Sequence, residues 1–202
     1  MSDQIIYGTL FRIIEFLGTF AFAISGIRHA AAKRFDWFGG FVCGVAVAIG
    51  GGTIRDVMLG VTPFWMTSSI YLVCTVLAQI FVIVFARYLK RLDTLGLALF
   101  TIAGLQKTID CGHPFWVAII MGCITGSAGG VIRDVLLNNV PVIFRKEIYA
   151  MASVLGGLAY WGLVVAGLDV SMAVIVSFLI ICAIRLLAVK YHISLPILKV
   201  DE

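Results

Sequence analysis

The chain has 202 residues, of which 61% are hydrophobic and only 13% are charged. Its mean hydropathy of +1.08 is far above that of a water-soluble domain of this length, which excludes a soluble enzyme or soluble binding domain. The net charge of +4 comes mainly from basic residues at the ends of apolar stretches, so it indicates membrane orientation and not binding to nucleic acid.

The apolar stretches predict an all-α integral membrane protein. A helix crosses the hydrocarbon of a bilayer with about 20 mostly apolar residues, and continuous runs of that length do not fit the alternating strands of a barrel. Seven such runs follow one another, at residues 5–27, 38–60, 67–87, 92–108, 115–137, 148–167 and 170–189. We therefore predict one membrane domain over 1–202 that crosses the bilayer seven times.

The basic residues predict which side of the membrane each connection faces. Cytoplasmic connections carry an excess of Lys and Arg. The first, third and fifth connections and the C-terminal tail carry ten of them, Arg28, Lys33, Arg34, Arg87, Lys90, Arg91, Arg145, Lys146, Lys190 and Lys199. The opposite connections have essentially Lys107 alone. The N-terminus is therefore expected outside the cell, and the tail over 191–202 in the cytoplasm.

A seven-residue phrase occurs twice, as Gly50 to Asp56 and as Ala128 to Asp134, and it belongs to a longer repeat. At the same offset of 78 residues, Gly18 matches Gly96, Phe22 matches Phe100, Pro63 matches Pro141 and Tyr71 matches Tyr149. These coincidences predict two copies of a three-helix unit, over 7–88 and 85–166, followed by a seventh helix over 168–190. Because each unit has an odd number of spans, the second copy enters the membrane from the other side, as in many transport proteins.

Glycine runs lie in the middle of the second and fifth spans. The first run is Gly50, Gly51 and Gly52, and the second is Gly129 and Gly130. Each glycine costs about 1 kcal/mol relative to Ala in a helix interior, so a kink or a short unwound segment is expected. Carbonyl groups freed there would line a transport pathway; in the alternative interpretation the glycines only allow close helix packing.

Each glycine run is followed by an Arg-Asp couple within the same span, Arg55 with Asp56 and Arg133 with Asp134. At 1.5 Å per residue the two arginines lie about 9 Å from the bilayer middle on opposite sides, too far apart for the couples to neutralise one another. Neighbours at i and i+1 also point apart on a helix. We therefore expect each of these charges to pair with a residue of another span.

The repeat supplies the candidate partners, because equivalent residues are expected to make equivalent pairs. Glu15 is equivalent to Asp93 at the 78-residue offset, and His29 is equivalent to Lys107. The four predicted pairs are Arg55 with Glu15, Arg133 with Asp93, Asp56 with Lys107, and Asp134 with His29. A bare arginine repels cations in a pore, so these charges are interpreted as structural locks or gating groups in preference to ion ligands.

The paired glycine-rich segments ending in Arg-Asp, the prolines that follow them, the inverted repeat and the seventh span together resemble the trimeric intracellular cation (TRIC) channel family, in its prokaryotic branch. The resemblance implies a homotrimer in the cell membrane, with a pore in each subunit between kinked second and fifth helices. It also implies passive permeation of monovalent cations, chiefly potassium and also sodium, down their gradients. One departure is Ala128, which stands where the first copy has Gly50.

Two other functional classes compete with the channel interpretation. The same prokaryotic group carries the name of a duplicated glycine-transporter domain, so a secondary transporter for glycine or another small amino acid is the alternative. A membrane enzyme is less well supported, because the chain has no HExxH motif, phosphate loop or cysteine cluster. We expect no cofactor and no metal site, and membrane lipid as the other binding partner.

Overall fold

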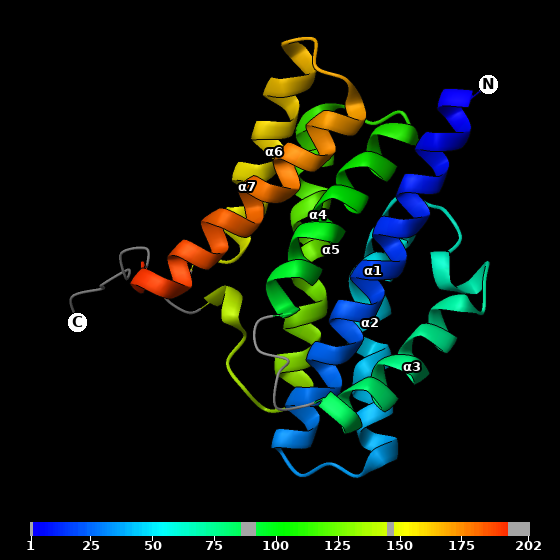
Figure 1. Cartoon of the computed structure of the whole chain (residues 1–202), viewed down its shortest axis with the longest axis vertical. Coiled ribbons are helices and arrows are strands. Elements are labelled where there is room, and N and C mark those ends of the chain that lie inside the picture. Colours follow the sequence, from blue (N-terminus) through cyan, green and yellow to red (C-terminus); the bar gives the residue numbers. More distant parts are fainter. Residues whose placement is uncertain (1, 86–91, 145–147, 194–202) are drawn as a thin grey trace.

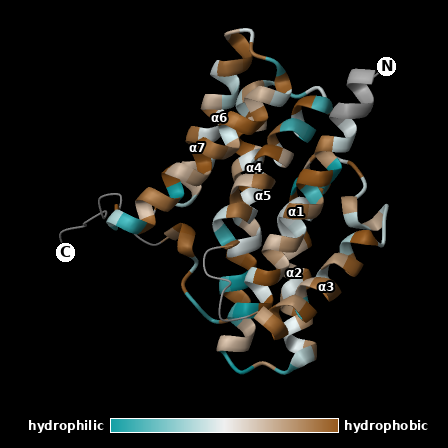
Figure 2. Ribbon diagram, in the orientation of Figure 1, coloured by the Kyte–Doolittle hydropathy of each residue, from teal (hydrophilic) through white to brown (hydrophobic). Residues whose placement is uncertain are grey.

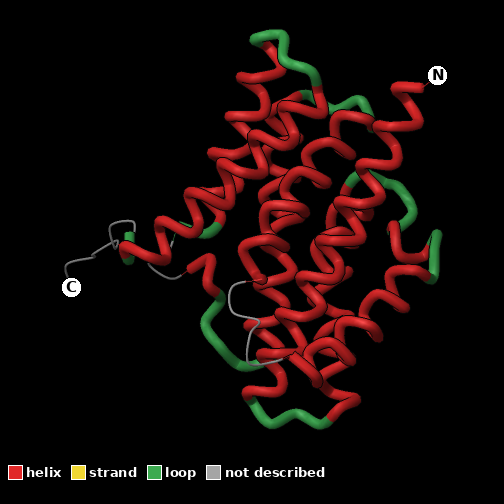
Figure 3. Tube along the Cα trace, viewed as in Figure 1, coloured by secondary structure: helices red, strands yellow, loops and turns green. Residues whose placement is uncertain are grey.

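The computed structural model describes residues 2–85, 92–144 and 148–193. In this part of the chain every regular element is helical (Figure 3), which confirms the predicted all-α class. The elements are α1 (Ser2–Ala32), α2 (Trp37–Met58), η1 (Phe64–Met66), α3 (Ile70–Phe85), α4 (Leu92–Asp110), α5 (Phe115–Leu136), η2 (Val142–Phe144), α6 (Ala150–Val165) and α7 (Val170–Tyr191). Residues outside the described ranges include Arg87, Lys90, Arg91, Arg145, Lys146 and the tail from 194 onward.

Length and composition divide the helices into three groups. Four are long and apolar enough to cross a bilayer by these criteria alone, over Gly8–Ala32, Trp37–Met58, Phe115–Leu136 and Val170–Tyr191. The described parts of α3 and α6 are apolar but have 16 residues each. The remaining helix, α4, has 19 residues, most of which are buried against other helices. Protein therefore shields most of its polar side chains, among them Thr94, Thr101, Gln106 and Thr108, from lipid.

The ends of the helices repeat between the two units. Gly60 follows α2 and Asn138 follows α5, and both adopt positive φ angles, of 68° and 51°. Arg34 follows α1 and Gly112 follows α4, again at positive φ. Glycine adopts this conformation freely and asparagine tolerates it, so equivalent helices end at equivalent turns. The expected unit boundaries, 7–88 and 85–166, stay predictions.

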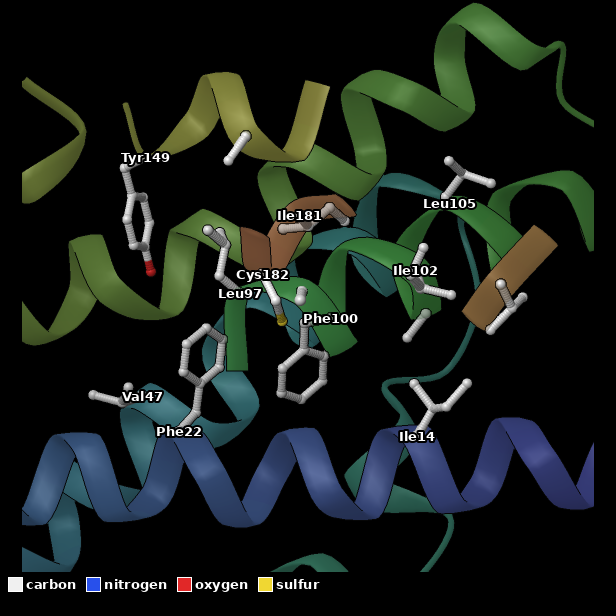
Figure 4. Close-up of a cluster of buried hydrophobic side chains, with 14 of the residues drawn as sticks. Ile14, Phe22, Val47, Leu97, Phe100, Ile102, Leu105, Tyr149, Ile181 and Cys182 are labelled. Carbon is white, nitrogen blue, oxygen red and sulfur yellow. The ribbon is translucent and has the colours of Figure 1, made fainter. Parts of the chain in front are cut away.

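Successive helices are joined by short connections and run up and down the molecule (Figure 1), so α1 and α4 run in opposite directions. Their side chains meet at equivalent positions. Phe22 of α1 stacks on Phe100 of α4 with ring centroids 5.3 Å apart, as Figure 4 shows. Gly18 and Gly96 make room for these rings, since an added Cβ would lie 3.1 Å from Phe100 or overlap Phe22. The two units therefore face one another as the predicted inverted repeat.

Large apolar side chains cover the outer surface of this bundle. Trp37, Phe38 and Val84 are 76%, 74% and 64% exposed. The hydrophilic residues lie at the connections and in a few short stretches of the helices, as the colouring of Figure 2 shows. An apolar exterior with polar groups inside is the distribution expected of a protein surrounded by lipid.

Candidate functional site

The glycine runs lie where α2 crosses α5. A Cβ added to Gly51 would overlap the backbone oxygen of Thr125, and one added to Gly129 would lie 2.6 Å from the backbone oxygen of Val47. Val47 and Thr125 are themselves equivalent at the 78-residue offset. The crossing is thus reciprocal, with each helix presenting a glycine to a carbonyl group of the other. Close approach of the two backbones requires the missing side chains.

The expected short unwound segment is not present. Both α2 and α5 are continuous α-helices through their glycine runs. Tight packing of one helix on the other stabilises the helical form and offsets the low helix propensity of glycine. A bend within an otherwise continuous helix stays a prediction, whereas the close-packing interpretation describes what Gly51 and Gly129 do in this conformation.

Four charged side chains gather beyond the first glycine run, and we call Glu15, Arg55, Asp56 and Lys107 the Arg55 cluster. Arg55 is fully buried, and its Nη2 atom lies 3.4 Å from Glu15 Oε1. Lys107 Nζ lies 2.8 Å from Asp56 Oδ1. The residues come from α1, α2 and α4, so the cluster ties three helices together. Two of the four predicted pairs are confirmed here.

The segment that follows α2 completes the hydrogen bonding of the Arg55 cluster. Pro63 is followed by the turn η1, whose first residue, Phe64, donates its backbone N–H to Asp56 Oδ2 at 2.7 Å. Tyr71 donates its hydroxyl proton to Glu15 Oε2 at 3.1 Å. A buried carboxylate is stable only when its lone pairs are satisfied, and the turn supplies one of the donors. The repeated proline therefore positions a backbone N–H that holds the charged couple.

The second group, which we call the Arg133 cluster, consists of Ser25, Asp93, Arg133 and Asp134. Arg133 Nη1 contacts Asp93 Oδ1, which confirms a third predicted pair. The same nitrogen donates to Ser25 Oγ at 2.9 Å, and Ser25 in turn donates to Asp93 at 3.3 Å. Asp134 Oδ2 accepts the backbone N–H of Val142 at 3.0 Å, as Asp56 accepts that of Phe64. The two clusters thus share one plan.

Neighbouring residues do pair in both clusters, contrary to the expectation from helix geometry. Arg55 Nε donates to Asp56 Oδ1 at 2.7 Å, and Arg133 Nε donates to Asp134 Oδ1 at 2.9 Å. The Cβ atoms of residues i and i+1 point apart, but an arginine side chain is long enough to bend back across its own helix. The guanidinium group therefore bridges its own aspartate and an acid of another helix.

The fourth predicted pair, between His29 and Asp134, is not among the ion pairs of the described residues. His29 instead donates its Nδ1 proton to the backbone oxygen of Ser25, one turn earlier, at 2.7 Å. The imidazole ring is shorter than the side chain of Lys107, and it bonds to its own helix. The Arg133 cluster consequently lacks an equivalent of the Lys107 ammonium group.

Two residues that the sequence reasoning missed belong to this neighbourhood. One is Ser25, whose equivalent in the first unit is Ala103. The other is Arg185 of α7, whose guanidinium carbon lies 4.8 Å from the centre of the Tyr149 ring. Tyr149 is buried within electrostatic reach of Asp93 and Arg133. An intramembrane arginine in the seventh span was the available signal for Arg185, because such charges need partners.

Neither cluster has the composition of a metal site. Among the described residues, no group of three or more His, Cys, Asp and Glu side chains is arranged to hold a metal ion. The carboxylates of both clusters are occupied by Arg, Lys and backbone N–H donors.

Comparisons with known proteins agree with the inverted repeat. The sequence profile of a family described as glycine transporter matches the chain twice, over residues 12–87 and 90–165. The UPF0126 inner membrane protein YadS of Escherichia coli K12 is 38% identical over 202 residues, which cover 94% of this chain and 96% of that protein. A UPF0126 membrane protein of Vibrio cholerae is 37% identical over 204 residues, which cover 96% of this chain and 85% of that protein.

The solved structures specify the family. The TRIC trimeric intracellular cation channel orthologue from Rhodobacter sphaeroides superposes with a TM-score of 0.86 at 32% identity, covering 92% of this chain and 100% of that one. The chain belongs to the TRIC family, in its prokaryotic branch. A TRIC structure from C. elegans has the same fold at 15% identity, with a TM-score of 0.62.

Placing the chain in the TRIC family explains why the site is double. The duplicated unit that defines the sequence profile contributes one glycine crossing residue and one Arg-Asp couple per copy. The two copies meet at the crossing of α2 and α5, with a charged cluster beyond each glycine run. The site is therefore a property of the pair of repeats and not of either alone.

Proposed function

We propose that this protein is a passive channel for monovalent cations, permeable to potassium, with one pathway in each subunit of a homotrimer. The observation that carries the proposal is the likeness, over nearly the whole chain, to the solved TRIC cation channel from Rhodobacter sphaeroides. The pathway runs along α2 and α5 and passes the two charged clusters. The N-terminus lies outside the cell and the C-terminus in the cytoplasm.

We further propose that the crossing closes this pathway in the conformation described above. The backbones of α2 and α5 lie so close at Gly51 and Gly129 that a methyl group has no room there, and neither has a hydrated cation. Opening requires the two helices to separate at this point. The backbone oxygens of Val47 and Thr125, which face the glycines, would then be available to replace part of the hydration shell of a cation.

The charged clusters suit the role of locks for this motion. Each arginine joins one of the crossing helices to an acid on a different helix, Glu15 on α1 or Asp93 on α4. Such buried ion pairs hold the helices in a defined arrangement, because breaking one pair leaves a buried charge without a partner and without water. When α2 separates from α5, each acid therefore has to move together with its arginine, or the arginine has to exchange that acid for another partner.

Currents across a planar bilayer test the proposal. The purified full-length protein is expected to give unitary steps in symmetrical KCl, with weak discrimination between potassium and sodium. An alternating-access carrier turns over too slowly to give resolvable unitary currents. Saturable glycine uptake by proteoliposomes, without such currents, would establish the transporter alternative that the family description names.

A matched pair of variants connects the currents to the crossing. In Gly51→Ala the added methyl group meets the backbone of α5, and a change in open probability is expected. In Gly162→Ala the added Cβ has no atom within 4 Å, so unchanged currents are expected. Equal currents from Gly51→Ala, Gly162→Ala and the unmodified protein would contradict a pathway at the crossing.

A further inference from the structure

The outer faces of the two repeats differ in what covers them. In the second unit, α7 packs against both α4 and α6, and Ile181 lies over Gly156 so closely that a Cβ there would overlap it. The equivalent helices of the first unit are α1 and α3, which lie side by side in Figure 1. Side chains on their shared face are left open, with Leu17 48% exposed and Leu77 50% exposed.

This face is hollowed into a groove that changes character along its length. Near the N-terminal half of α1 lies a cavity of 630 Å³, whose lining includes Arg12, Ser68 and Tyr71. A second hollow of 450 Å³ continues toward the end of α3 and is lined only by apolar side chains, including Leu77 and Phe81. Phe16 and Leu17 line both hollows. The two hollows therefore form one groove with a polar end and an apolar end.

We propose that this groove binds a phospholipid with an anionic headgroup, from the leaflet that the N-terminal half of α1 faces. The phosphate group lies against Arg12 and Ser68, and one acyl chain runs along α1 and α3 past Leu77. An arginine fork matches a phosphate group in charge and geometry, and basic pockets of this kind bind lipid headgroups. The proposal depends on the membrane location of the chain and not on channel activity.

The hydrogen bonding at the polar end leaves donors available for such a ligand. Within the described part of the chain, Arg12 has no ion-pair partner. Ser68 Oγ accepts the backbone N–H of Ile70 at 3.4 Å, which leaves its hydroxyl proton for a phosphate oxygen. Glu15, which lies behind Tyr71, is already engaged by Arg55 and by the Tyr71 hydroxyl group.

The position of Arg12 along α1 agrees with a headgroup ligand. Arg12 precedes Glu15 by three residues, or about 4.5 Å along the helix axis. Glu15 contacts Arg55, which the sequence places about 9 Å from the bilayer middle, so Arg12 lies near the edge of the hydrocarbon. The phosphate groups of lipids lie just beyond that edge.

Lipid retention by the purified full-length protein tests this site. The protein is incubated in detergent with phosphatidylglycerol or phosphatidylcholine, and bound lipid is counted by native mass spectrometry. Arg12→Gln is expected to lower bound phosphatidylglycerol at least threefold and phosphatidylcholine less. Leu77→Trp, which fills the apolar end, is expected to lower both. Lys33→Gln removes one exposed positive charge beyond the opposite end of α1 and is expected to change neither.

Three results would overturn the proposal. One is unchanged phosphatidylglycerol binding in Arg12→Gln with an intact elution profile and circular dichroism spectrum. Another is an equal loss in Lys33→Gln, which would indicate general attraction between charges. The third is a changed oligomeric state in Leu77→Trp without loss of lipid, which would show that a second copy of the chain covers the groove.

Discussion

The Arg55 cluster and the Arg133 cluster are copies of one design that have become unequal. Both place an arginine between its neighbouring aspartate and an acid of another helix, and both hold the aspartate with a backbone N–H eight residues later. In the Arg55 cluster, Asp56 also binds Lys107, and Arg55 Nη1 has no hydrogen-bond partner in the described part of the chain. In the Arg133 cluster, Ser25 supplies the additional acceptor.

The difference shows how a duplicated scaffold specialises without losing its geometry. The backbone plan is shared because the two units have the same helices, turns and glycine crossing. The inequality comes from single positions at which equivalent residues of the two units differ. Ser25 is equivalent to Ala103, and His29 is equivalent to Lys107. In addition, α7 has no equivalent in the first unit, and its Arg185 brings a cation to Tyr149. Four sets of substitutions, in order of decreasing effect on stability, test this comparison.

Removing the aspartates is expected to have the largest and the most unequal effect. Asp56→Ala leaves Lys107 without its carboxylate and leaves Arg55 with Glu15 alone at 3.4 Å. Loss of one partner of a buried ion pair costs about 3–5 kcal/mol. Asp134→Ala is expected to cost less, because Arg133 keeps Asp93 and Ser25. Thermal unfolding in detergent measures both, and equal losses would show that the clusters are energetically equivalent.

Exchanging the charges of one inter-helix pair tests whether that pair acts as a lock. Arg55→Glu and Glu15→Arg are each expected to destabilise the protein, because each puts like charges together at a buried site. The double variant is expected to recover part of the loss, by about 1–3 kcal/mol of coupling. If the loss of stability in the double variant equals the sum of the losses in the two single variants, Arg55 and Glu15 do not interact energetically.

The glycine crossing is expected to respond symmetrically, in contrast to the clusters. Gly51→Ala and Gly129→Ala each push a methyl group toward a backbone oxygen of the other helix, which costs about 1–3 kcal/mol. Gly162→Ala is the control, since its methyl group meets no atom and alanine favours the helix by about 1 kcal/mol. Thermal unfolding of the three variants measures these terms, and a neutral Gly129→Ala would show that the crossing is not reciprocal.

The smallest expected effect concerns the hydroxyl group that distinguishes the clusters. Ser25→Ala removes one of the acceptors of Arg133 and is expected to destabilise the protein by about 1 kcal/mol. Ala103→Ser places a hydroxyl group at the equivalent position, where it is expected to bind Arg55 Nη1 and to stabilise the protein by a similar amount. If Ala103→Ser lowers the midpoint of thermal unfolding, the two arginines do not occupy equivalent environments.

Much of the site followed from the 78-residue offset and helix periodicity. Three of the four predicted ion pairs form, Arg55 with Glu15, Arg133 with Asp93 and Asp56 with Lys107. They could be predicted because a buried charge demands a partner and the repeat reduces the choice to equivalent residues. The pair of His29 with Asp134 failed because equivalence of position does not ensure equal reach, and imidazole is shorter than a lysine side chain.

The membrane environment, the inverted repeat and most of the partners of the buried charges could be predicted from the amino-acid sequence alone. These properties depend on composition, on the length of apolar runs and on a constant spacing, all of which are local or periodic. The three-dimensional structure was needed to show that α2 and α5 remain helical through their glycines, and that each arginine bends back to its own aspartate. The structure also brought Ser25 into the Arg133 cluster and Arg185 to the neighbouring Tyr149, and it revealed a groove between α1 and α3. These features depend on helix rotation, crossing distance and side-chain reach, which contacts between distant segments set together.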